Sequence, residues 1–98
     1  MNEEVKNKWI TELRSGKYSQ AIKTLKDGDC YCPLGILCLI YFKEHGGDFK
    51  EIPPTSYIPQ HISKWAKLNI LKQDDIMKMN DEQNLSFEQI ADFIQKNY

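Results

Sequence analysis

Apolar residues recur at the spacing of one helical face near the N-terminus. They are Val5, Trp9, Ile10 and Leu13. Asn2 can cap such a helix, and Gly16 can adopt the left-handed conformation that ends it. The pattern therefore predicts a first helix that runs from Asn2 to Arg14.

Residues 33–45 form the most apolar stretch of the chain, and their apolar side chains cover every face of a helical cylinder. A helix that is apolar all round must be buried. Pro33 suits its first position, and Gly46 follows its last. Gly35 and Cys38 form a small-residue patch where another segment can approach. This segment is predicted to be the centre of the core.

The C-terminal region carries a capping box, with Ser86 as the cap and Gln89 three residues later. The face of the helix that follows is formed by Phe87, Ile90, Ala91 and Ile94. Two shorter helices are expected before it. They cover residues 59–67, with Ile58, Ile62 and Trp65 inward, and 74–80, with Ile76 and Met79 inward.

Two segments are less regular. Residues 17–32 fit either a short helix or a hairpin in which 20–26 pairs with 29–32 across Asp27-Gly28, and we favour the hairpin. Residues 48–58 are broken by Pro53 and Pro54 and read as an irregular segment pinned to the body. The prediction is a mainly α single domain over residues 1–98, with about five helices and one short β-hairpin (α+β).

Composition and charge argue against several classes of function. The 98 residues carry 13 basic and 14 acidic side chains, and Arg14 is the only arginine. This balance argues against a general nucleic-acid binder. No apolar run is long enough to cross a membrane. The N-terminus, Met1 to Arg14, is charged throughout and has no apolar stretch of the kind that a signal peptide needs. Three cysteines in such a chain indicate free thiols, so we expect a cytoplasmic protein.

The charges are unevenly distributed. Residues 1–26 carry six cations and three acids, whereas residues 74–98 carry two cations and six acids. The basic part either forms an anion-binding face or is ordinary solvated surface. Its members are Lys6, Lys8, Arg14, Lys17, Lys23 and Lys26.

The three cysteines are candidates for a metal site or a catalytic thiolate. Cys38 and His45 lie seven residues apart on one predicted helix, about 10 Å along its axis, too far to share a zinc ion with Cys30 and Cys32. No metal or cofactor is expected. Cys32 precedes a helix whose dipole could stabilise a thiolate, but no base lies nearby in the sequence, so packing is the favoured role.

The segment Tyr31-Cys32-Pro33-Leu34-Gly35-Ile36-Leu37-Cys38 resembles the "YCCLGVLC" signature of a family of small, mostly uncharacterised phage and prophage proteins. Residues 9–18 resemble its "W…LRSGKY" opening, residues 58–66 its "LP…WAGL" helix, and residues 79–92 its "LND…LSFxEIAD" ending. Pro33 replaces the second cysteine of the signature. The family provides no activity to transfer, but the resemblance implies a phage accessory protein.

We therefore expect a non-enzymatic binder that acts on the bacterial host as a counter-defence protein. It would either sequester a small anionic or nucleotide signal or block a host protein through segment 48–58. Homo-oligomers are compatible with both forms, and no membrane partner is expected. The alternatives are a small enzyme using Cys32 and a DNA-binding protein using helix 86–97. The ligand contacts predicted for the sequestering form are Arg14, Lys17, Tyr18, Lys23, Tyr31 and Trp65.

Overall fold

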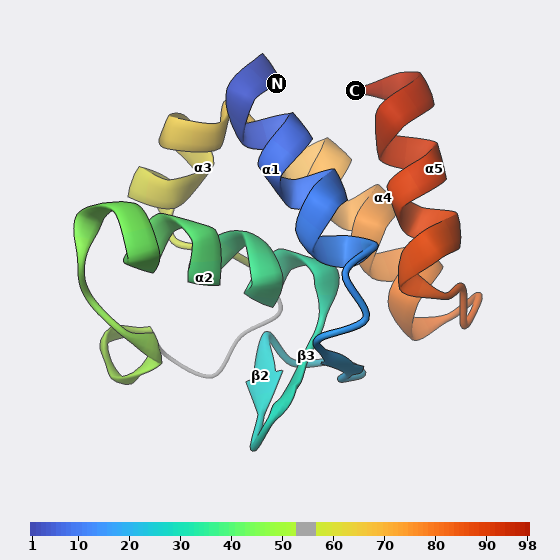
Figure 1. Cartoon of the computed structure of the whole chain (residues 1–98), viewed down its shortest axis with the longest axis horizontal. Coiled ribbons are helices and arrows are strands. Elements are labelled where there is room, and N and C mark those ends of the chain that lie inside the picture. Colours follow the sequence, from blue (N-terminus) through green and yellow to red (C-terminus); the bar gives the residue numbers. More distant parts are fainter. Residues whose placement is uncertain (53–56) are drawn as a thin grey trace.

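The computed structural model describes residues 1–52 and 57–98 and forms one domain of five α-helices with a small sheet (Figure 1). Pro53 and Pro54, which the sequence placed in an irregular segment, lie outside the described residues. The elements in chain order are α1 (Glu3–Leu13), β1 (Ser19–Gln20), β2 (Lys26–Asp27), β3 (Cys30–Tyr31), α2 (Pro33–His45), a 3-10 turn η1 (Phe49–Glu51), α3 (Gln60–Ala66), α4 (Ile70–Asp81) and α5 (Phe87–Asn97).

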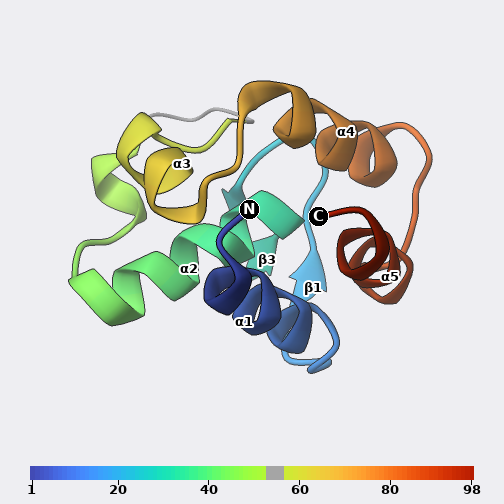
Figure 2. The same ribbon diagram turned by 90° about the horizontal axis from the view of Figure 1, so that it is seen from above.

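Helix α2 is the centre of the core, as its composition predicts. Its first six residues and Ile40 are buried. The helices α1, α3 and α4 surround it, and α5 packs on α1 (Figure 2). The indole Nε1 of Trp9, on α1, donates a hydrogen bond of 2.8 Å to the carbonyl of Pro33 inside the core. This bond fixes α1 across the beginning of α2.

Gly35 lets the chain cross the first turn of α2 at very short range. A Cβ atom at this position would lie 1.9 Å from the carbonyl oxygen of Leu25. The same oxygen accepts a hydrogen bond of 3.2 Å from the backbone N–H of Cys32. The small-residue patch predicted in α2 is thus occupied, at Gly35, by backbone rather than by a side chain.

The hairpin expected in residues 17–32 is confirmed, but it is much shorter than expected, and its turn is formed by Gly28 and Asp29 instead of Asp27 and Gly28. Strand β2 pairs antiparallel with β3 around Gly28, and β1 pairs parallel with β3 on its other side. Residues 21–25 form no strand. Lys23 adopts a left-handed conformation (φ +63°), and its backbone N–H donates to the carboxylate of Asp81. This contact draws the loop onto α4 and interrupts the pairing.

Helix α4 begins four residues earlier than the acidic pair at 74–75 indicates. Asn69 caps it by accepting a hydrogen bond from the backbone N–H of Lys72. The capping box of α5 and the cap of α1 at Asn2 are both confirmed. The helix predicted over 59–67 is observed as α3. In the described part of the chain, no helix is long and apolar enough to cross a membrane.

Two buried amide side chains, seven residues apart on α4, fasten irregular segments to the core. Gln73 accepts from the backbone N–H of Ile58 and donates to the carbonyl of Leu68. Asn80 donates to the carbonyl of Ala21 and accepts from Gln20. Each amide replaces backbone pairing that these segments lack, which keeps their buried polar groups satisfied.

The Gly35→Ala variant tests the crossing at α2. Because the added methyl group must displace the Leu25 backbone, we expect a loss of about 3 kcal/mol in unfolding free energy, or failure to fold. Gly16→Ala is the control, since Gly16 (φ +75°) has open space around it and should lose only about 1–2 kcal/mol. Urea unfolding followed by circular dichroism gives both values. A smaller loss for Gly35→Ala than for Gly16→Ala would contradict the packing described.

Candidate functional site

Six aromatic rings in contact form a row from the sheet to α3, which we call the aromatic strip. Its consecutive ring centroids lie 5.6, 5.8, 5.2, 6.1 and 5.2 Å apart. All six side chains are half-buried, so each has one side in the core and another in solvent. In order along the row, they are Tyr18, Tyr31, Phe49, Phe42, Tyr41 and Trp65.

Tyr41 is the most connected ring of the strip. Besides Phe42 and Trp65, it stacks on the imidazole of His45 at 4.5 Å and meets that of His61 edge-on at 5.3 Å. Both histidines are exposed. The second half of α2 extends out of the core here. Its side chains, among them Tyr41 and Phe42, therefore reach the surface, whereas the first six residues of the helix are buried. The result is an aromatic and imidazole surface shared by α2 and α3.

A pocket of about 270 Å³ lies beside the strip. It is lined by Phe42 of the strip and by His61, which contacts Tyr41 of the strip. Its described lining is mostly apolar, with Glu51 and Tyr57 as further polar groups. The hydroxyl of Tyr57 donates to a carboxylate oxygen of Asp74 at 2.6 Å. The complete described lining is Phe42, Glu51, Ile52, Tyr57, Ile58, Pro59 and His61.

Of the six predicted ligand contacts, the structure gathers the three aromatic ones, Tyr18, Tyr31 and Trp65, into the strip. The three cations are not part of the strip and face acidic residues, although Lys17 and the strip residue Tyr18 contact the same carboxylate, that of Glu12. Lys17 lies 3.9 Å from Glu12. Lys23 lines a separate hollow on α4 together with three carboxylates and Lys78. The guanidinium of Arg14 pairs with carboxylates of α5.

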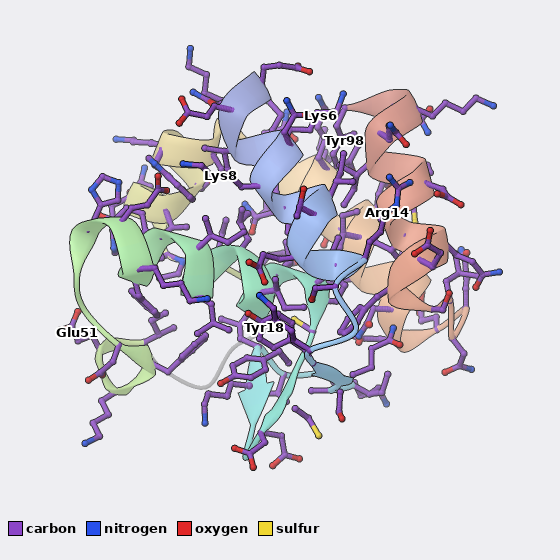
Figure 3. The ribbon with its side chains drawn as sticks, in the orientation of Figure 1. Lys6, Lys8, Arg14, Tyr18, Glu51 and Tyr98 are labelled. Carbon is purple, nitrogen blue, oxygen red and sulfur yellow. The ribbon has the colours of Figure 1, made fainter. Side chains whose placement is uncertain are left out.

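The side chain of Arg14 connects the basic N-terminal part of the chain to the acidic C-terminal part. Its guanidinium lies 2.5 Å from Asp92 and 3.3 Å from Glu88, and it also donates to Gln95 at 3.0 Å. Lys8 leaves α1 on the other side and pairs with Glu4 and Glu44 (Figure 3). The acidic partners of Arg14 thus lie in the C-terminal part of the chain, whereas those of Lys8 do not. The basic residues do not form one anion-binding face.

Cys32 occupies the N-cap of α2, and its sulfur accepts a weak hydrogen bond from the backbone N–H of Gly35 at 3.4 Å. Burial raises the pKa of its thiol to about 11 and that of Cys38 to about 12. Both side chains are therefore protonated thiols at neutral pH, which does not favour a nucleophile. Among the described residues, no group of three or more metal-ligating side chains comes together.

The comparison with known families matches residues 1–74 to the family described as Domain of unknown function (DUF8296). The chain belongs to this family. The matched segment contains every ring of the aromatic strip and every described residue of the pocket, whereas α5 lies outside it. No curated protein and no solved structure matches the chain.

Sequence reasoning missed Tyr41, Phe42 and Phe49 as surface residues. In segment 33–45 the apolar residues show no preferred face, so periodicity cannot tell which turn emerges from the core. The signal that could have found the surface is the change along α2 from small and aliphatic residues to Tyr41, Phe42 and His45. Such a change is typical of a helix that ends at a surface.

Arg14 and Asp92 offer a test of the charge complementarity. Because both side chains are partly exposed, a double-mutant cycle with Arg14→Ala and Asp92→Ala should give a coupling of about 0.5–1 kcal/mol, which weakens in 1 M NaCl. Lys50→Ala, which removes an exposed cation elsewhere, should change the unfolding free energy by less than about 0.5 kcal/mol. A coupling of zero at low salt would show that the pair is ordinary solvated surface.

Proposed function

We propose that this member of the DUF8296 family is a non-enzymatic binding protein that docks a partner protein on the aromatic strip. The observation that carries the proposal is the continuous row of half-buried rings. Tyrosine and tryptophan are enriched at the centres of protein interfaces, because they bury large areas at a small cost in conformational entropy. Rings that are already packed together lose little freedom when a partner covers them.

The nature of the partner follows from the resemblance and from the charges. The resemblance to phage and prophage proteins supports a bacterial host protein as partner, and a site of action in the host cytoplasm. Arg14 is engaged by Asp92 and Glu88, and Lys17 lies nearest to Glu12, which weakens support for a free anionic ligand. Blocking a host protein is therefore favoured over sequestering a signal.

A second candidate, binding of a small nucleotide-like anion, keeps one supporting observation. At the sheet end of the strip, Tyr18 and Tyr31 meet edge to face, and the Lys26 ammonium lies 5.8 Å from the centre of the Tyr31 ring. A base could stack there near a cation. DNA binding through α5 receives less support, because that helix exposes Glu88 and Asp92 and its described residues include only one lysine.

Site-specific photo-crosslinking in host cells tests the docking proposal. A benzophenone amino acid in place of exposed His61, which contacts Tyr41 of the strip, should crosslink a host protein. The same group in place of Leu71, which is 72% exposed on α4, serves as the matched control and should not. The purified partner should then bind the wild-type protein, and Tyr41→Ala should weaken this binding about tenfold or more in calorimetry.

Two results would contradict the proposal. One is equal crosslinking from positions 61 and 71, and the other is unchanged affinity of Tyr41→Ala with its fold intact by circular dichroism. Calorimetry against a panel of mono- and dinucleotides provides the arm for the second candidate. Saturable binding there, lost in Tyr31→Ala, would favour sequestration over docking.

A further inference from the structure

The pocket beside the strip combines an apolar floor with one carboxylate. Phe42, Ile52, Ile58 and Pro59 provide the floor, and Glu51 is the only acidic residue in the described lining. No lysine or arginine is among the described lining residues. The volume, about 270 Å³, lies below the roughly 300–1,000 Å³ of pockets for drug-sized ligands. The pocket therefore suits a single side chain or a small molecule with one charged end.

Gly47 brings the carboxylate and the aromatic wall together. A Cβ atom at this position would lie 3.2 Å from Oε2 of Glu51 and 3.3 Å from Cδ1 of Phe42. Gly47 also has a φ of +100°, a backbone conformation that residues other than glycine rarely adopt. The turn after α2 is thus shaped so that Glu51 and the Phe42 ring approach the same point.

Within the described residues, the side chain of Glu51 has no ion pair and no hydrogen bond. Glu4, Glu12, Glu44 and Glu88 instead face cations of the same chain. Glu3 and Glu82 also have no ion pair among the described residues, but neither lines this pocket. A carboxylate at the rim of an apolar pocket has a free charge to offer. The complementary ligand is an organic cation on an apolar stem, which can make a charge-assisted hydrogen bond and also contact aromatic rings.

We propose that this pocket binds an alkyl guanidinium or ammonium group, and that its occupant in the complex is an arginine or lysine side chain of the partner protein. The alkyl stem would pack on Phe42 and Ile58, while the charged end reaches Glu51. The identity of the occupant rests on the proposed docking function. The cation site itself rests only on the pocket. Arginine is, with tryptophan and tyrosine, among the residues enriched at the energetically dominant positions of protein interfaces, which lie in well-packed pockets.

The experiment is an NMR titration of the isolated, isotopically labelled protein with N-acetyl-arginine methylamide and N-acetyl-lysine methylamide. Either compound should shift the amide signals of residues around the pocket in a saturable manner. N-acetyl-citrulline methylamide has nearly the same shape without the charge, and should bind at least about tenfold more weakly. Glu51→Gln should weaken the binding of the cationic compound by a similar factor. Glu82→Gln, which removes an exposed carboxylate at the end of α4, should leave it unchanged.

Equal binding of the citrulline compound, or unchanged binding in Glu51→Gln, would overturn the cation site. Spermidine distinguishes a free polyamine from a protein side chain. Binding of spermidine more than tenfold tighter than that of both amino-acid compounds would overturn the partner side chain as occupant. Because the titration needs no partner, its result is independent of the crosslinking. Failure of the docking proposal would leave the cation site standing, and loss of the cation site would leave docking on the strip standing.

Discussion

The first turn of α2 is the constraint on which the rest of the structure depends. Three parts of the chain meet there: the indole of Trp9 binds the Pro33 carbonyl, the Leu25 carbonyl crosses over Gly35, and the sulfur of Cys32 caps the helix. These contacts fix α1 and the small sheet relative to α2. In the segment that resembles a family signature, residues 32–38 are buried in the packing around this turn, and Tyr31 is half-buried. The two thiols of this segment, Cys32 and Cys38, are buried, and burial raises their pKa values to about 11 and 12.

Elements with strong local signals could be predicted from the sequence. The composition of 33–45 indicated the buried helix, and the Ser86 and Gln89 pair indicated the start of α5. The features that were not predicted depend on contacts between separate segments of the chain. The parallel pairing of β1 with β3 joins residues 11 apart in sequence. The loop held by Asn80 needs a contact 59 residues away. Local patterns reveal neither of these contacts. The start of α4 was missed because Asn69 gives a quieter capping signal than the acidic pair that follows.

Among the predicted ligand contacts, the structure brings the aromatic residues together in one surface but not the cations. Tyr31 and Trp65 were chosen as stacking residues, and the fold places both in one strip. Arg14 was chosen for its charge, but charge alone does not reveal whether its counterpart is a ligand or another part of the chain. The acidic residues of 74–98 contained that answer, since the side chains that Arg14 pairs with lie there. A cationic side chain should therefore be compared with the acidic residues of the same chain before it is assigned to a ligand.

The reactivity of the three thiols tests most directly whether the signature segment is framework or chemistry. Peptide mapping of iodoacetamide labelling at pH 8 should show the half-buried Cys30 modified first. The buried Cys32 and Cys38 should react only at the rate at which the protein opens, because burial raises their pKa values to about 11 and 12. Their protection should weaken as the pH rises towards these values. Labelling of Cys32 ahead of Cys30 in the folded protein at neutral pH would contradict the account and restore the enzymatic alternative.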